Sequence, residues 1–430
     1  MVSGVRRPSR PSTLIAGLGR AQQPNVANRE AAHVNPEGAT RRHGRNWIVL
    51  LTNVLYPCHT GGIEIFHYYF AKTLSKHFPL AVLAECDRRF PEFRIRVRDI
   101  RSPFGRLQTV FTLAHHVDFI RRNRDRIGLI HIPYSSGHLF QYYHVMALAR
   151  RYGIPYVLRI SSGHMLPAKP DWLHKVYFRH AAARIGVSDM ISDEYMRRYG
   201  YPVETIHSYL PFLRPKHSRA ELRALRHVPP DDLVFLCLGT VKTFKGPDVL
   251  VAALERLGAE FMRQHRIYVL FVGDGGLLEP LRGRITDSGL ADRVQFTGKV
   301  PHERVHEYYA LSDVFIIPSL AEARPLALSE ALFNGLPAIG SDITVISGMI
   351  ENGRNGLLFP KGNAEALAKH IRCMAETGDL RERLAAGAVS GRLRYDQFAS
   401  MMERYRALYG QLIADAEMHI RRRNPKNGGA

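Results

Sequence analysis

The sequence contains few cysteines and no long apolar run. Its four cysteines lie far apart and show neither a CxxC pair nor a cysteine–histidine spacing suited to zinc: Cys58, Cys86, Cys237 and Cys373. This usage fits a reducing, cytoplasmic setting best. No uninterrupted apolar run approaches the length needed to cross a bilayer, and arginine and proline stand where a signal peptide needs an apolar core. We therefore expect any membrane contact to be peripheral.

Acidic residues are also scarce, because 39 Asp and Glu stand against 60 Lys and Arg and leave a net charge of +21. Such an excess predicts anionic partners, which could be nucleic acid, an anionic membrane surface or phosphorylated substrates. Composition alone does not choose among these three. Hydrophobic residues at 45% and charged residues at 23% are ordinary globular values, so they argue against overall disorder.

The length of 430 residues favours two domains, each with its own core. Residues 1–45 are rich in Arg, Pro, Ser, Gly and Asn without an apolar period, which predicts a basic disordered tail. Gly17-Leu18-Gly19 within it is not a dinucleotide-binding loop, because no strand precedes it and Gln22 occupies the third glycine position.

From Trp47 onward, apolar runs alternate with helix-like stretches. The run 47–51 predicts a buried strand, and apolar residues at helical spacing follow Gly61-Gly62. Strands alternating with helices indicate a parallel, doubly wound sheet. Further apolar runs lie at 79–84, 128–132, 156–160 and 184–187.

The stretch 211–230 interrupts this alternation with prolines and scattered charge, after which it restarts. The second series of apolar runs lies at 233–239, 267–273, 293–297, 313–317 and 337–340. Two similar α/β halves predict a cleft between them. The stretch 394–416 has a core-facing helical stripe, and the domain on which it packs is left open, with a return to the N-terminal domain as one arrangement. The predicted organisation is a tail (1–45), an N-terminal acceptor-side domain (46–215), a C-terminal donor domain (216–393) and a final helix with a basic tail (394–430).

The segment 322–330, Glu-Ala-Arg-Pro-Leu-Ala-Leu-Ser-Glu, has the features of an anion site. Arg324 precedes a proline and is pushed toward an extended conformation, while Pro325 has the φ suited to the first helical position. The next backbone N–H groups face outward from the helix start and can bind an anion. They belong to Leu326, Ala327 and Leu328.

Two glutamates flank this helix start. Glu322 lies on the loop after a strand, and Glu330 lies about 7.5 Å along the helix axis. Taken singly, each would be an ordinary solvated residue. Their joint placement at a strand end in the second half favours a ligand with hydroxyls on both sides of a diphosphate, which is the layout of a nucleotide sugar.

Two glycine-containing turns precede this segment. Lys245, in the turn 239–246 after the first strand of the second half, can place its ammonium against phosphate oxygens and stabilise a departing diphosphate without a metal. The turn at Gly273 allows close approach of a ligand, although many α/β turns use glycine.

At these residues the chain, from about 46 to 416, resembles the retaining glycosyltransferases of family four, which have the GT-B architecture of two facing Rossmann-like domains. Glu322 and Glu330 match the family's pair of glutamates separated by seven residues, and Lys245-Gly246 matches its lysine-glycine. Further matches are Gly273-Asp274-Gly275, 294–298 and 355–358.

The N-terminal half carries two weaker matches. The segment 59–64, with Gly61 and Gly62, resembles the family's glycine loop that meets the donor phosphate. His131 resembles a strand-end histidine near the reacting sugar, and the alternative is a satisfied histidine without catalytic work. His164 lies near a second histidine-glycine region of the family but in altered order, so it receives no role.

Some positions depart from the family. Thr240 stands where arginine is common, which leaves Lys245 with Lys242 or Arg324 to neutralise phosphate. Residues 343–348 stand where the family usually has a glycine-rich loop, and their sequence is Ile-Thr-Val-Ile-Ser-Gly. The glutamate that follows this loop in the family is replaced by Met349 or displaced to Glu351. These changes suggest a second hypothesis, a catalytically degenerate GT-B protein that binds a nucleotide sugar without transferring it.

The resemblance implies metal-independent transfer from a UDP- or GDP-sugar with retention of anomeric configuration. The implied catalytic residues are Glu322 for sugar hydroxyls, Lys245 for diphosphate charge and His131 for orienting the sugar. The donor-binding set is Gly61, Gly62, Thr240, Lys245, Gly273, Arg324, Leu326, Ala327 and Glu330, the last for ribose. A nucleotide-sugar epimerase or a glycosyl phosphorylase on the same fold is a related alternative.

The acceptor is expected to be a glycan or lipid-linked molecule of cell envelope polysaccharide biosynthesis. Two arginine clusters suit a lipid headgroup, a phosphorylated glycan or an anionic membrane surface, although alternate arginines also line solvated strands. A nucleic-acid-binding α/β protein is the alternative from another class, but no aromatic-plus-basic motif accompanies the charge, so no nucleic-acid partner is expected. The clusters are Arg94, Arg96, Arg98, Arg101 and Arg106, with Phe93 and Phe104 among them, and Arg121, Arg122, Arg124 and Arg126.

Overall fold

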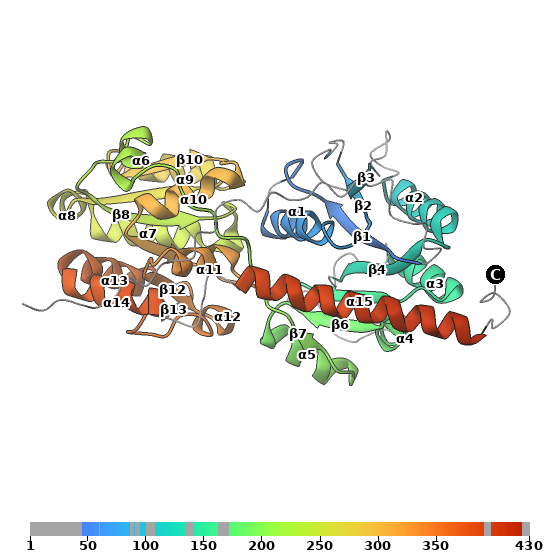
Figure 1. Ribbon diagram of the computed structural model, residues 1–430. Coiled ribbons are helices and arrows are strands. Elements are labelled where there is room, and N and C mark those ends of the chain that lie inside the picture. Colours follow the sequence, from blue (N-terminus) through green and yellow to red (C-terminus); the bar gives the residue numbers. More distant parts are fainter. Residues whose placement is uncertain are drawn as a thin grey trace, which may run out of the picture. The chain divides into compact units, whose positions relative to one another are not determined.

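The computed structural model describes residues 45–59, 61–86, 90, 95–99, 108–134, 142–161, 172–390 and 397–423. From Gly44 onward the chain forms one compact unit, which contains two parallel sheets. The fold class predicted from the sequence, two Rossmann-like doubly wound sheets, is confirmed (Figure 1).

The first sheet has seven strands in the order β3-β2-β1-β4-β5-β6-β7. Its strands are β1 (Trp47–Val54), β2 (Leu80–Glu85), β3 (Ile95–Asp99), β4 (Ile127–Tyr134), β5 (Tyr156–Ile160), β6 (Ala183–Gly186) and β7 (Glu204–Thr205). The helices between them are α1 (Gly62–Leu74), α2 (Gln108–Asn123), α3 (Tyr143–Tyr152), α4 (Trp172–His180) and α5 (Asp189–Tyr199).

The second sheet has six strands in the order β10-β9-β8-β11-β12-β13. They are β8 (Leu233–Leu238), β9 (Ile267–Val272), β10 (Val294–Gly298), β11 (Val314–Ile317), β12 (Ala338–Asp342) and β13 (Gly356–Pro360). Its helices are α6 (Arg219–Leu225), α7 (Pro247–Leu257), α8 (Ala259–Gln264), α9 (Leu278–Asp287), α10 (His302–Leu311), α11 (Leu326–Phe333), α12 (Thr344–Ser347), α13 (Ala364–Glu376) and α14 (Gly378–Ser390), with a short 3₁₀ turn at Thr243–Lys245.

Apolar cores lie on both faces of each sheet, which is why the strands are continuous apolar runs and not alternating ones. In β1, Val49 and Leu51 belong to one core cluster, while Ile48 and Leu50 belong to the cluster on the other face. In β8, Phe235 likewise faces one cluster and Leu236 the other.

The last helix, α15 (Gln397–Arg423), packs on the first sheet, which the sequence left open. Figure 1 shows it running along that sheet, and contacts with α1 and β4 hold it there. Its buried stripe includes Met401, Tyr405 and Tyr409, as the helical spacing predicted. The ring of Tyr405 meets Phe70 of α1 edge-on, with centroids 4.8 Å apart.

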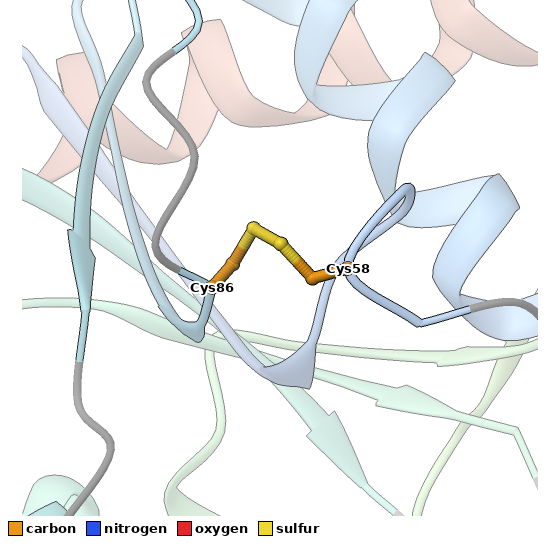
Figure 2. Close-up of a disulfide and its surroundings, with 2 residues drawn as sticks. All are labelled: Cys58 and Cys86. Atoms are coloured by element: carbon orange, nitrogen blue, oxygen red, sulfur yellow. A yellow bond between two sulfur atoms is a disulfide. The ribbon is translucent and has the colours of Figure 1, made fainter.

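Cys58 and Cys86 form a disulfide with an S–S distance of 2.08 Å (Figure 2). No spacing pattern in the sequence marked this pair. The physical reason is that β1 and β2 are parallel neighbours, so the residues that follow them meet at one edge of the sheet although they are 28 residues apart in sequence. Cys237 and Cys373 are free.

Some expectations fall outside the described residues: His164 and the cluster members Arg94, Arg101, Arg106, Phe93 and Phe104. Arg96 and Arg98 lie at alternate positions of the edge strand β3. In the part of the chain that the structure describes, none of the helices has the length and apolar character needed to cross a membrane. Those same residues contain no group of three or more His, Cys, Asp or Glu arranged to hold a metal ion.

We predict that Tyr405→Ala destabilises the fold, because Tyr405 is fully buried between α15 and α1. Truncating a large buried aromatic side chain typically costs about 3–5 kcal/mol. Urea unfolding followed by circular dichroism should show the loss as a lower midpoint. Gln411→Ala on the exposed face of α15 is the control, and equal midpoints for the two variants would contradict this packing.

Candidate functional site

The predicted site residues of the second half lie at the carboxyl edge of its sheet, where the strand order reverses. From β8 the chain moves outward to β9 and β10 and then returns to β11, on the other side of β8. Loops that diverge from two such neighbouring strands leave a crevice between them, which is where open α/β sheets bind ligands. Lys245 follows β8 and Glu322 follows β11.

Lys245 and Glu322 form an ion pair, with 2.6 Å between Nζ and Oε1. The hydroxyl of Ser319 donates to the same carboxylate oxygen at 2.9 Å. Glu322 is only 7% exposed, whereas the Lys245 side chain is 29% exposed. The pair therefore neutralises a buried carboxylate and leaves the ammonium accessible to a further anion.

The two loops that carry this pair are fastened to each other. The carbonyl oxygen of Phe244 accepts hydrogen bonds from the backbone N–H groups of Leu320, at 2.8 Å, and Ala321, at 3.2 Å. Gly246 has a φ of +63°, and a Cβ there would lie 2.1 Å from the carbonyl oxygen of Pro318. Only glycine permits this approach, which accounts for the Lys245-Gly246 dipeptide.

Gly273 serves a similar close contact between the loops after β9 and β8. It has a φ of +142°, and a Cβ there would lie 1.8 Å from the carbonyl oxygen of Gly239. Thr240 follows Gly239 and is partly exposed, and its carbonyl oxygen accepts a hydrogen bond from the N–H of Lys242 at 2.9 Å. Both predicted residues thus lie on the loops that adjoin the crevice.

Helix α11 begins at Leu326 with Pro325 as its N-cap, so the proline stands one position earlier than predicted. The N–H of Leu328 bonds to the carbonyl of Pro325 at 3.2 Å and does not face outward as expected. The N–H groups of Leu326 and Ala327 stand at the first turn, where a helix offers donors without intrahelical acceptors.

Glu330, on the second turn of α11, lies in a shielded polar cluster. Its Oε2 accepts a hydrogen bond from the hydroxyl of Tyr309 at 3.2 Å, and its Oε1 lies 3.7 Å from Nε2 of His302. Burial raises the pKa of Glu330 to about 7, against the opposing effect of the Tyr309 hydrogen bond. Burial lowers the pKa of His302 to about 4, so His302 is neutral at pH 7 and the two groups are not an ion pair there.

A small cavity of about 20 Å³ lies beside Glu330. The segment that follows β7 covers one side, and helices α10 and α11 form the other. Its lining includes Leu210, Phe212, His302, His306, Tyr309 and Glu330. Tyr309, His302 and Ser319 were not predicted, because no short sequence motif marks them and only the packing of α10 on α11 brings the first two to Glu330.

Arg324 contacts Tyr209, in the segment that joins the two sheets. Its guanidinium lies over the ring of Tyr209, 5.0 Å from the centroid, and burial lowers its pKa. Its predicted role in phosphate binding stays a prediction.

The glycine loop of the first half meets the start of α11. Gly61 is the N-cap of α1, and a Cβ on Gly62 would lie 3.4 Å from the side chain of Leu326. The first turns of α1 and α11 are thus neighbours, and both present helix N-termini that favour an anion.

His131 lies in the core instead. It is fully buried on β4, its Nδ1 pairs with the hydroxyl of Tyr409, and its ring lies 5.3 Å from Phe70. Burial holds its pKa well below the ordinary histidine value. The placement supports the alternative of a histidine without catalytic work, with Nδ1 paired and Nε2 buried without a hydrogen-bond partner, and gives no support to contact with a sugar. The physical reason is that β4 continues to Tyr134, so His131 is mid-strand and not at its end.

Known protein families and individual proteins resemble this chain in sequence. The family described as glycosyl transferases group 1 matches residues 218–389. The chain is 27% identical over 294 residues to the alpha-D-kanosaminyltransferase of Streptomyces kanamyceticus, covering 63% of this chain and 75% of that protein.

Two solved structures share the fold. Sucrose-phosphate synthase from Thermosynechococcus elongatus superposes with a TM-score of 0.70 at 20% identity, covering 86% of this chain and 100% of that one. HepE from Anabaena, in complex with UDP-glucose, superposes with a TM-score of 0.64 at 19% identity, covering 86% of this chain and 98% of that one.

The raised pKa of Glu330 predicts a pH-dependent stability. Because the folded pKa is about 7 and the ordinary value is 4.5, the folded state binds more protons between these values, and stability falls as pH rises through that window. Glu330→Gln removes this dependence. The melting temperature of the variant minus that of the wild type should therefore rise by about 2–4 °C from pH 4.5 to pH 8. Glu279→Gln, at an exposed carboxylate of α9, is the control. If the difference in melting temperature between Glu330→Gln and the wild type stays constant across this pH range, Glu330 does not titrate in it.

Proposed function

We propose that the crevice between β8 and β11 binds a UDP- or GDP-sugar without a metal ion, in a retaining glycosyltransferase of GT-B architecture whose residues 218–389 match the glycosyl transferases group 1. The observation that carries the proposal is the Lys245–Glu322 pair, which holds an accessible ammonium against the loop that leads into α11. The likeness to HepE with UDP-glucose supports UDP as the nucleotide.

Each group has a role that follows from its position. Lys245 and the N–H groups of Leu326 and Ala327 stabilise the negative charge that develops on the leaving diphosphate. Glu322 accepts hydrogen bonds from sugar hydroxyls, and Glu330 accepts them from the ribose. Gly61 and Gly62 let the start of α1 approach the phosphates from the other side.

The reaction breaks the bond between the anomeric carbon and the diphosphate oxygen and forms a bond from that carbon to an acceptor oxygen. The proton of the acceptor hydroxyl passes to the departing diphosphate oxygen. Lys245 already has a carboxylate partner, so a bound diphosphate shares its ammonium with Glu322. This sharing frees part of the Glu322 carboxylate for the sugar hydroxyls while charge moves to the leaving group.

The acceptor proposal rests on the first half. We propose a glycan or lipid-linked acceptor, a cytoplasmic location and peripheral contact with an anionic membrane. The support is α2, where Val110 and Leu113 are 57% and 40% exposed and the exposed Arg121 and Arg122 follow on the last turn. Exposed apolar groups together with arginine suit an interface with anionic lipid.

We predict that Lys245→Ala and Glu330→Gln each lower turnover by about 100-fold or more, because each removes a group held against the donor. A thermal-shift screen with UDP, GDP, ADP and their sugar conjugates, in EDTA throughout, should show stabilisation of the wild type by one nucleotide family. Lys245→Ala should lose that shift. Lys369→Ala, at an exposed lysine of α13, is the control. Equal shifts in wild type and Lys245→Ala would refute the assigned site.

The membrane proposal predicts that reversing Arg121, Arg122 and Arg124 to glutamate weakens binding to vesicles containing anionic lipid by at least about tenfold. Co-sedimentation at low and physiological salt measures it. Reversing the exposed Arg282, Arg354 and Arg372 in the second half controls for net charge. Unaltered binding by the α2 variant would end the proposal.

A further inference from the structure

The loop between β1 and α1 is held by a covalent bond. His59 donates its backbone N–H to the carbonyl oxygen of Leu55 at 3.1 Å, which closes a turn, and Cys58 within it bonds to Cys86 after β2. Figure 2 shows the bond joining this loop to the end of β2. Cys86 is 2% exposed, whereas Cys58 is partly exposed. A thiol from solvent therefore has access to the sulfur of Cys58 first.

The same loop contacts the helix that adjoins Glu330. Tyr56 is 4% exposed, and its hydroxyl donates to the carboxylate of Glu303 and accepts a hydrogen bond from the N–H of His302 at 3.3 Å. The ring of Tyr69, from α1, meets His302 edge-on with centroids 5.4 Å apart. The first turn of α10 is thus held from the side of the first sheet.

His302 continues this connection to the candidate donor site, since its Nε2 lies 3.7 Å from Glu330. A change in the position of the β1–α1 loop therefore acts on two parts of that site. It shifts the Gly61-Gly62 turn that opens α1, and it releases the first turn of α10 beside Glu330.

We propose that Cys58–Cys86 is a thiol–disulfide exchange site, and that the bond and Tyr56 together position the β1–α1 loop for binding of the nucleotide sugar. The proposal rests on the proposed function, because its consequence is measured on the donor. In a reducing compartment the bond is subject to reduction, so donor affinity depends on the thiol redox state.

The exchange needs a small dithiol as reductant. Its thiolate attacks Sγ of Cys58, the S–S bond breaks, and Cys86 leaves as a thiolate that takes up a proton. The second thiol of the reductant then attacks the mixed disulfide, which frees Cys58 as a thiol and leaves the reductant as a cyclic disulfide. Two electrons and two protons pass to the protein.

A thiol count on the full chain tests the bond without any donor. Protein prepared without reductant and then denatured and alkylated should carry label on Cys237 and Cys373 alone, and on all four cysteines after treatment with dithiothreitol. Label on Cys58 and Cys86 before reduction would overturn the proposal.

Hydrogen exchange tests the positioning, again without a donor. Reduction should accelerate amide exchange in peptides spanning the β1–α1 loop and the first turn of α10, where the N–H of His302 bonds to Tyr56. Unchanged exchange in both peptides after confirmed reduction would overturn the proposal. This result is independent of whether the chain binds UDP-sugars, so it separates failure of this inference from failure of the proposed function.

Kinetics with UDP-glucose as the probe test the consequence. Reduction should raise KM about tenfold and leave kcat within about twofold, because the loop positions donor-binding groups and not the reacting atoms. Cys58→Ser with Cys86→Ser should match the reduced protein and lose the response to dithiothreitol, whereas Cys373→Ser should keep it.

Tyr56→Phe keeps the ring and removes only the hydroxyl, so it should raise KM in the oxidised protein. In the variant with both Cys58→Ser and Cys86→Ser, Tyr56→Phe should raise KM little further, because both changes act on the same loop. Fully additive effects, or a KM that is the same before and after reduction, would contradict a shared positioning role.

Discussion

The site depends on one geometric constraint, the reversal of strand order between β8 and β11 at the middle of the second sheet. Parallel strands end at one edge, and only at the reversal do two neighbouring loops turn to opposite faces and leave room for a ligand. Lys245 and Glu322 come from those two loops, and their ion pair joins them. The hydrogen bonds that the Phe244 carbonyl accepts, and the close approach that Gly246 permits, hold the two loops in contact with each other.

The two carboxylates at this edge experience different environments although they lie on one short segment. Glu322 is paired with a lysine and a serine, so its charge is compensated. Glu330 is surrounded by Tyr309 and a neutral His302, and burial raises its pKa to about 7. A polyol ligand that offers hydroxyl donors supplies the compensation that Glu330 lacks, so binding favours its ionised form. The protein thus keeps one charged and one incompletely compensated carboxylate on either side of the helix start.

Much of the fold could be predicted, because strands buried on both faces are continuous apolar runs. The exceptions are edge elements: β3 is five residues with alternating arginine, and β7 is two residues long. Within the site, Lys245, Glu322 and Glu330 were recognisable because each stands at a fixed offset from a strand end or a helix start. Tyr309 and His302 were not, because their relation to Glu330 arises from the packing of two helices. His131 is the opposite case, because the sequence pattern predicted a strand end there, whereas β4 continues for three more residues to Tyr134.

The disulfide shows why cysteine spacing in sequence is a poor guide in a parallel sheet. Residues that follow adjacent parallel strands are separated by a whole crossover helix, here 28 residues, yet meet at one edge. The edge in question is the one from which Gly61-Gly62 opens α1 and Tyr56 reaches α10. A bond placed at the opposite edge would constrain the fold without touching a ligand. Placed where it is, it constrains the loop on which the two halves of the candidate site meet, so its redox state and donor binding are thermodynamically coupled.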